Sequence, residues 1–135
     1  MRRSVESGLL TVEKGSAVYE RKDFDQPDDR TEFPHGRADV LDMGGTRVQR
    51  VTFEPGFVWS TDMASLVGTE LCPVRHVFHV LSGRMGLRVP DGSEEEVGPG
   101  AVVFLEPGHD SWTVGDEPVV FVEFDPKRDP NYPPD

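Results

Sequence analysis

The sequence has little of several features that define other classes of protein. Its 135 residues include one cysteine, Cys72, so an internal disulfide is excluded, and a lone thiol is typical of a reducing compartment. No apolar run approaches the length of about 20 residues that a membrane-spanning helix needs. Arg2-Arg3 gives a basic start, but Leu9-Leu10 is far too short for the apolar part of a signal peptide. We therefore expect a cytoplasmic protein with no membrane partner.

Positive charge is also scarce. The chain has 14 lysine and arginine residues against 25 aspartate and glutamate residues, which gives a formal net charge of −11 at pH 7. Nucleic acids and anionic membranes bind proteins through positively charged surfaces. The charge balance therefore argues against either of them as a partner.

The alternation of apolar and polar residues, interrupted by turn residues, predicts an all-β domain. In the segment 75–89, a strand with two histidines, His76 and His79, turns at Ser82-Gly83 into a second strand. The short run Ala101–Leu105 is apolar at every position, which is typical of a strand buried on both faces. No long helix is indicated, so we expect a β-barrel with imidazoles near its opening.

Three parts of the chain differ in composition. Residues 1–37 are expected to form an N-terminal edge strand, near Leu9 to Val12, and a loop, because Asp23 to Glu32 is too polar to pack. Residues 38–125 are expected to form the barrel. Residues 126–135 are rich in proline and are expected to be an extended tail.

Within the barrel, Gly44-Gly45 predicts a hairpin turn. A later strand is expected to run from Phe57 to Asp62. The segment 63–74 has no clear period and is expected to be a long loop near the mouth of the barrel, where functional residues often lie.

The segment from Pro55 to Gly115 resembles the small, single-domain cupins, which are jelly-roll barrels. The first motif of that family is G-x5-H-x-H, a spacer, and E-x6-G. Gly56 and Asp62 match the opening of this motif, and His76 and Gly83 match its end. The resemblance implies an all-β, cupin-type jelly-roll β-barrel that holds a small molecule and forms a homodimer.

The second motif of the family, G-x5-P-x-G-x2-H-x3-N, is matched less fully. Gly100 and Gly108 stand at its two glycines, but Glu106 replaces the proline and Gly115 replaces the asparagine. The match therefore indicates the fold more strongly than it indicates an activity.

The metal-ligand positions of the family are altered. In metal-binding cupins, two histidines of the first motif, its glutamate and the later histidine hold a divalent ion. Those four positions are occupied here by Asp62, Ala64, His76 and Ser111. Alanine cannot bind a metal and serine binds one poorly, so the usual ligand set for a divalent transition metal is not intact.

A different set of residues could replace those ligands. His109 lies two residues before Ser111 and would share its face of a strand. Asp62, His76 and His109 would then form a two-histidine, one-carboxylate site, which suits Fe(II) and similar ions with open positions.

A second alignment of the first motif uses Glu70, Cys72 and His76, whose spacing also satisfies it if no insertion is present. In this alignment Ala64 stands where the upstream glycine is expected. Cys72 has no histidine and aspartate partner at a fixed spacing, so the sequence does not indicate nucleophilic catalysis by this thiol.

The same residues also allow chemistry without a metal. If His76 points inward, the two-residue period of a strand turns Phe78 and Val80 inward as well. Burial would lower the pKa of His76 unless a carboxylate such as Asp62 offset it. His76, oriented by Asp62, would then be a general acid or base for isomerisation, epimerisation or dehydration.

Four further residues are candidates for contact with the bound molecule: Ser60, Phe78, Val80 and Ser111. Three functions therefore follow from the sequence. The first is a proton-transfer enzyme that acts on a small molecule, the second is a metal-dependent, oxygenase-like cupin, and the third is a non-catalytic binding or sensing module.

Overall fold

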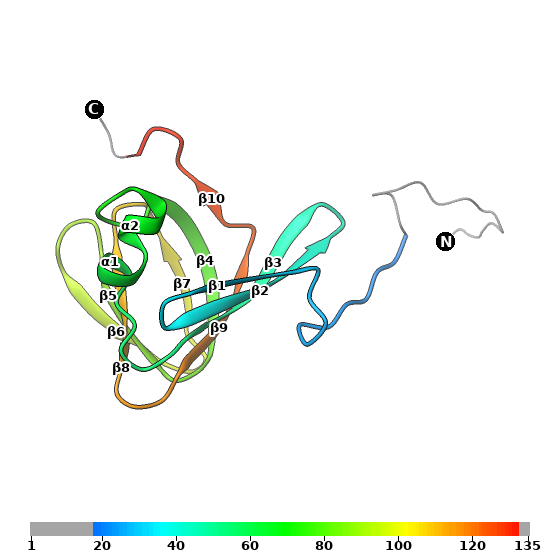
Figure 1. Cartoon of the computed structure of the whole chain (residues 1–135), viewed down its shortest axis with the longest axis horizontal. Coiled ribbons are helices and arrows are strands. Elements are labelled where there is room, and N and C mark those ends of the chain that lie inside the picture. The colour runs from blue at the N-terminus through cyan, green and yellow to red at the C-terminus, as the bar shows by residue number, and fades with distance from the viewer. Residues whose placement is uncertain (1–17, 133–135) are drawn as a thin grey trace.

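Figure 1 shows a computed structural model of the chain, which describes residues 18–132. The elements in chain order are β1 (Asp29–Phe33), β2 (Gly36–Met43), β3 (Thr46–Phe53), α1 (Trp59–Asp62), α2 (Ala64–Val67), β4 (Val74–Ser82), β5 (Arg84–Arg88), β6 (Glu94–Val97), β7 (Val102–Leu105), β8 (Asp110–Val114), β9 (Val119–Phe124) and β10 (Lys127–Arg128). The edge strand expected near Leu9 to Val12 lies outside the described residues. Neither helix in the described part is long and apolar enough to cross a bilayer.

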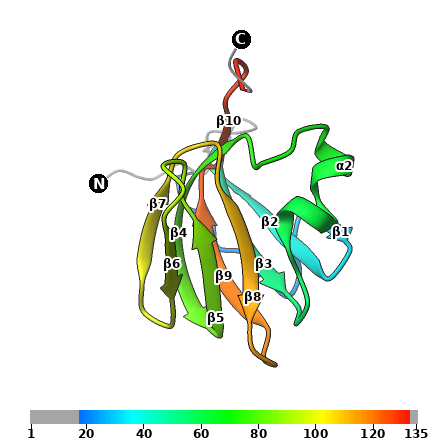
Figure 2. The same cartoon turned by 90° about the vertical axis from the view of Figure 1, so that its left-hand side faces the viewer.

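The strands form two antiparallel sheets, and the chain is all-β with a jelly-roll barrel (Figure 2). The larger sheet has the order β1-β2-β3-β9-β4-β10, with β7 also paired to β4, and the smaller has the order β6-β5-β8. The chain passes from one sheet to the other at Gly83, whose φ is 78°. A Cβ atom there would lie 2.1 Å from the carbonyl oxygen of Pro118, so only glycine fits this crossing.

The core lies between the sheets and is rich in phenylalanine. Phe53 and Phe57 stack with ring centroids 3.9 Å apart, and Phe121 meets Phe53 edge to face at 5.1 Å. On β4, Phe78 and Val80 are buried, as the two-residue period predicts. The inner face of β4 is therefore the face that carries His76.

The first strand lies in a segment that was expected to be a loop. Residues Asp29–Phe33 pair with β2 along their whole length, so the expectation for Asp23 to Glu32 is wrong at its C-terminal end. A polar strand is stable here because its side chains find charged partners. Arg30 faces Asp39 across the pair and donates to its carboxylate at 2.7 Å.

The strand expected from Phe57 to Asp62 is also absent. The chain forms α1 and α2 instead, and Gly68 ends α2 in the left-handed conformation with a φ of 92°. Alternation between faces therefore does not apply to this segment. Trp59 is nevertheless buried in the core.

The expectation that Ala101–Leu105 is buried on both faces is wrong for a single chain. Val102 is 71% exposed and Phe104 is 52% exposed, whereas Leu105 is buried. The physical reason is that no element within residues 18–132 covers the outer face of β7, whose apolar side chains alternate between core and solvent.

One buried acid ties the first three strands together. The side chain of Asp39 on β2 is fully buried, and it forms ion pairs with Arg30 on β1, Arg37 on β2 and Arg50 on β3. Burial raises the pKa of Asp39, but the hydrogen bonds from Arg50 and Arg30 lower it more, so the net shift is downward. The carboxylate therefore stabilises the fold above its ordinary pKa, and this contribution is lost as the pH falls through the lower pKa of the folded state.

We expect Asp39→Asn to lower the free energy of unfolding by about 1–3 kcal/mol, because it leaves several guanidinium groups without their carboxylate. Urea denaturation at neutral pH would measure the change. Asp25→Asn is the matched control, because Asp25 also pairs with Arg50 but its side chain is 87% exposed. The control substitution should lower the free energy of unfolding by at most about 1 kcal/mol. Equal effects from the two variants would contradict this account of β1 to β3.

Candidate functional site

A cavity of about 380 Å³ lies inside the barrel. This volume is at the lower end of the range of about 300–1,000 Å³ that is typical of small-molecule sites. Its walls are mostly apolar and include Phe53, Phe57, Trp59, Phe78, Met85, Leu87, Leu105 and Phe121. A few polar side chains converge on this apolar space, as in most binding sites for small molecules.

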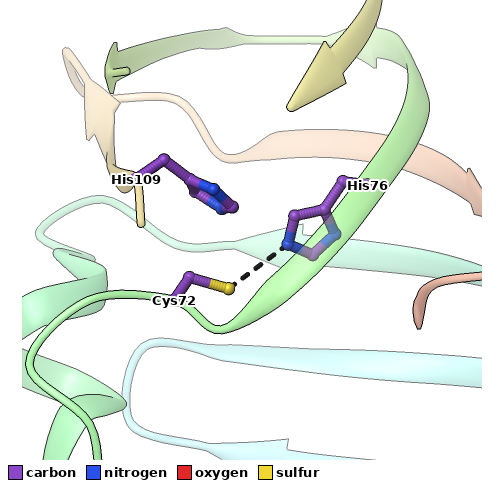
Figure 3. A group of neighbouring side chains, drawn as sticks. All are labelled: Cys72, His76 and His109. Atoms are coloured by element: carbon purple, nitrogen blue, oxygen red, sulfur yellow. Dashed lines mark hydrogen bonds between the residues drawn. The ribbon is translucent and has the colours of Figure 1, made fainter. Parts of the chain in front are cut away.

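Three of the polar groups form a cluster, shown in Figure 3: Cys72, His76 and His109. Their sulfur and nitrogen ligand atoms all lie within 4.8 Å of one another. Cys72 Sγ is 3.3 Å from His76 Nε2, and the centroids of the two imidazole rings are 4.9 Å apart. The cluster is therefore compact enough for its members to share a proton or a metal ion.

Three different segments bring these side chains together. His76 lies on β4, Cys72 lies just before β4, and His109 lies just before β8. The backbone N–H of Cys72 donates to the carbonyl of His109 at 3.1 Å and links the loop after α2 to the start of β8. This bond fixes the thiol beside the imidazole of His109.

A chain of side-chain bonds extends from His76 across the larger sheet. His76 Nδ1 bonds to Glu123 Oε2 on β9, and the amide of Gln49 on β3 donates to Glu123 Oε1 at 2.7 Å. Arg47 in turn donates to Gln49 Oε1 from both Nε and Nη2. Both oxygens of the buried Glu123 carboxylate are therefore paired, and the orientation of the His76 ring is fixed.

His109 is oriented by its own turn. Its Nδ1–H donates to the carbonyl of Glu106 at 2.7 Å, and the side chain is 2% exposed. A carbonyl can only accept, so Nδ1 carries a proton, and Nε2 holds a lone pair when the ring is neutral and a second N–H when the ring is protonated. Both imidazoles therefore have Nδ1 engaged by an oxygen and keep Nε2 available within the cluster.

The cluster also shifts the acidities of its members. Burial raises the pKa of Cys72, but the hydrogen bonds of His109 and His76 lower it more, and the result is a pKa of about 7. Burial lowers the pKa of His76, but its bonds to Cys72 and Glu123 raise it to about 9. Near neutral pH the metal-free pair thus has the character of a thiolate beside an imidazolium.

The structure brings together two of the three metal ligands expected from the sequence. His76 and His109 are neighbours, but Asp62 lies in α1 and bonds elsewhere. Its Oδ2 is 3.1 Å from His35 Nδ1 and accepts the backbone N–H of Val58 at 3.0 Å. Asp62 does not line the cavity, so it does not offset the burial of His76 as expected. Glu123 provides that offset.

The four residues expected to contact a ligand have different positions. Phe78 and Ser111 line the cavity. Val80 is fully buried and is not among the lining residues, and Ser60 bonds to Asp110 through its backbone N–H and its hydroxyl. Val80 therefore packs in the core, and Ser60 is an exposed residue that pairs with Asp110.

Two residues of the site were not assigned to it from the sequence. Glu123 was missed, although a glutamate between valine and phenylalanine in the apolar run Val119–Phe124 is the kind of signal that marks an inward-facing acid. Cys72 was considered only in the second alignment of the first motif. That alignment places Cys72 near His76, as observed, but it also includes Glu70, which is exposed and is not part of the cluster.

Comparisons with known proteins give likeness in structure only. No protein-family model matches the sequence, and no curated protein matches it. Solved structures do match. One is a sugar phosphate isomerase of the cupin superfamily from Silicibacter pomeroyi, with a TM-score of 0.60 and 19% identity over 82% of this chain and 77% of that one.

Two further matches have other activities. The polyketide cyclase RemF from Streptomyces resistomycificus has a TM-score of 0.54 and 25% identity over 73% of this chain and 70% of that one. An oxalate decarboxylase from Lactobacillus farciminis has a TM-score of 0.51 and 20% identity over 76% of this chain, but this chain spans only 31% of the decarboxylase. The shared property is the barrel, since three different activities occur on it.

We expect the thiol of Cys72 in metal-free protein to titrate near pH 7 instead of near its ordinary pKa of 9.0. Because the chain has a single cysteine, the ultraviolet absorbance of the thiolate measures this titration directly. His76→Asn should move the midpoint upward, because it removes a partner of the thiolate. His79→Asn, which changes the outward-facing histidine of the same strand, should leave it in place. A midpoint that His76→Asn does not move would contradict the coupling.

Proposed function

We propose that this chain, a cupin by its fold, is an enzyme that binds a small molecule in its barrel and holds a divalent metal ion with Cys72, His76 and His109. The observation that supports this most strongly is the direction of the two imidazoles. Each has Nδ1 bonded to an oxygen, His76 Nε2 lies 3.3 Å from Cys72 Sγ, and the ligand atoms of the three residues all lie within 4.8 Å of one another. Metal-binding histidines are typically oriented by such an oxygen on the second ring nitrogen.

The donor set can be tested against the chemistry of metal ions. Two imidazoles and one thiolate suit Zn²⁺ and other borderline divalent ions, and three protein ligands leave a position open for substrate or water. The low pKa of Cys72 favours the thiolate form that a metal requires. The residues present therefore fit a catalytic metal ion, although the set differs from that of metal-binding cupins.

A bound ion of this kind would act as a Lewis acid on a substrate oxygen or lower the pKa of a bound water. Residues of the chain would orient the metal ligands and bind the body of the substrate. Glu123 orients His76 and raises its basicity, and Gln49 holds Glu123 in place. Phe78, Leu105 and other apolar residues provide an apolar wall for the body of the bound molecule. Ser111 offers a hydroxyl near the cluster to orient the bound molecule.

A second candidate is proton transfer without a metal, with His76 as the acid or base. It is supported by the line from Glu123 through His76 to Cys72, in which a carboxylate fixes the imidazole beside the cavity. Glu123 replaces Asp62 as the supporting carboxylate in this mechanism. An oriented imidazole contributes on the order of 10²–10⁴ in rate when it lies within reach of substrate.

The state of the thiol bears on where the protein works. A cysteine that serves as a ligand must stay reduced, and Cys72 has no second cysteine to pair with. We therefore assign the chain to the cytoplasm, where thiols are kept reduced.

A homodimer would cover the apolar outer face of the larger sheet. The exposed residues on this face include Leu81 on β4 and Val102 and Phe104 on β7. Strands β4 and β7 are neighbours in the sheet, so these side chains belong to one surface. An antiparallel sheet with one face in water normally carries polar residues on that face. The apolar outer face therefore suits contact with a second copy of the chain.

We expect protein prepared with Zn²⁺ and then dialysed to retain about one ion per chain, measured by elemental analysis. Cys72→Ala, His76→Asn and His109→Asn should each abolish retention. Glu123→Gln should weaken binding by about 10–100-fold, because it removes the orienting carboxylate. Binding should also weaken as the pH falls, because protons compete for the ligand atoms.

Asp62→Asn is the control for metal binding and should retain the ion, since Asp62 bonds to His35 outside the cavity. Protein that binds no metal, yet has an activity that His76→Asn abolishes, would replace this proposal with metal-free proton transfer. Protein that binds a molecule without changing it, with equal affinity in His76→Asn, would indicate a binding or sensing module.

We expect the wild-type chain to migrate as a dimer and the double variant V102K/F104E to migrate as a monomer in size-exclusion chromatography with light scattering. Two charges on the outer face would oppose contact between copies without entering the core. Val103→Ala, on the inner side of the same strand, is the control and should remain a dimer. A wild-type monomer at micromolar concentration would contradict the dimer.

A further inference from the structure

Carboxylates neutralise nearly all the positive charges of this acidic chain. Within residues 18–132, all but three of the lysine and arginine side chains lie within 4.0 Å of an acidic side chain. The three exceptions are Arg47, Arg75 and Arg128. Arg75 lies over the ring of Phe104 on the outer face, 4.8 Å from its centroid. The other two both line the cavity.

The end of β9 links the two segments that carry the cavity arginines. The backbone N–H of Asp125, which follows β9, donates to the carbonyl of Arg47 at 2.7 Å. The chain then continues through Pro126, also a lining residue, into β10 and Arg128. Arg47 uses Nε and Nη2 to bond to the amide oxygen of Gln49, so its remaining N–H groups are directed elsewhere.

Both arginines are exposed, which places them at the rim of the cavity, and neither pairs with a carboxylate within the described residues. Acidic side chains are plentiful, but the carboxylate that lines the cavity, Glu123, is already bonded to Gln49 and His76. A guanidinium group binds a carboxylate with two parallel hydrogen bonds. An anionic group on a bound ligand would therefore provide the partner that these two arginines lack.

The other lining residues of the cavity indicate the polarity of the rest of that ligand. Most of the cavity's lining residues are apolar, and the polar ones beyond the cluster and the two arginines are Thr31, Gln49, Ser111 and Glu123, of which Gln49 and Glu123 are bonded to each other. A polyhydroxylated body would leave many hydroxyl groups without partners on such a surface, which disfavours its binding. An apolar aliphatic or aromatic body has no hydrogen bonds with water to lose when it is buried there.

We propose that the cavity binds a small carboxylic acid with an apolar body, and that Arg47 and Arg128 receive its carboxylate. This inference rests on the proposed role of the cavity as a small-molecule site, and it names the class of molecule. The acid group lies at the arginines, and the body extends over Phe78 and Phe121 toward the Cys72, His76 and His109 cluster.

The negative charge of the whole chain does not prevent this binding. At physiological ionic strength, charges more than about 8 Å apart are largely screened. A ligand at the cavity therefore experiences mainly the charges of the lining, where Arg47 and Arg128 outnumber the one carboxylate, Glu123, which is already bonded to Gln49 and His76. The local charge is opposite in sign to the net charge, and it selects anions among ligands of the same shape.

The test is calorimetric titration of the full chain with matched pairs of acid and amide: hydrocinnamate with hydrocinnamamide, and isocaproate with isocaproamide. Each pair keeps the body and removes only the charge. We expect the acid to bind at least about tenfold more tightly than its amide in at least one pair. Added salt should weaken the binding of the acid and leave that of the amide unchanged.

The variants locate the binding of the acid group. Arg47→Gln and Arg128→Gln should each lower affinity for the acid by about tenfold and leave affinity for the amide unchanged. Arg128 forms no side-chain bonds within the described residues, so its variant tests binding without disturbing the Gln49 and Glu123 network. Arg75→Gln is the matched control, because it removes the third unpaired arginine from the opposite side of the sheet, and it should change nothing.

The outcomes separate this inference from the metal-ion proposal, because metal content is measured on the same samples. If the protein holds no metal but still binds the acid more tightly than the amide, the result would support the carboxylate site and contradict the metal-ion proposal. Metal binding with equal affinity for acid and amide, or with no affinity for either pair, would overturn the carboxylate site. An acid preference that survives in Arg47→Gln and in Arg128→Gln would overturn it as well.

Discussion

One buried carboxylate constrains the geometry of the whole candidate site. Glu123 is 2% exposed and lies on an otherwise apolar strand, where an unpaired charge would cost several kcal/mol. The chain satisfies it with one partner for each oxygen, the amide of Gln49 and the imidazole of His76. The bond to Glu123 leaves the other nitrogen of His76 beside Cys72. The orientation of His76 within the cluster thus follows from the need to pair a single acid.

The features predicted correctly from the sequence are those that depend on a local repeat. The two-residue period of a strand places Phe78 and Val80 on the buried face, and the hairpin at Gly44-Gly45 joins β2 to β3 as its turn residues indicate. The proximity of Cys72 and His76 also has a local origin, since they are four residues apart. The all-β fold follows from many such signals in agreement.

The remaining features depend on contacts between distant segments. Glu123 and His76 are separated by 47 residues, and they meet because β9 pairs with β4 in the register that places Glu123 opposite Phe78. Nothing within β4 encodes that register. Asp62 shows the converse, because the short helix α1 replaces an expected strand and turns this residue toward His35. Alternation cannot predict a side chain's direction once the chain leaves the strand.

The barrel supplies positions, and the residues at those positions decide the chemistry. A sugar phosphate isomerase, a polyketide cyclase and an oxalate decarboxylase have similar barrels, at 19–25% identity to this chain. In this chain a thiol stands beside two imidazoles, which adds a soft ligand and a negative charge near neutral pH. The walls are apolar and the unpaired cavity cations are arginines. These features favour a substrate with a charged group at one end and a largely apolar body, because most of that body must leave water without gaining a hydrogen bond.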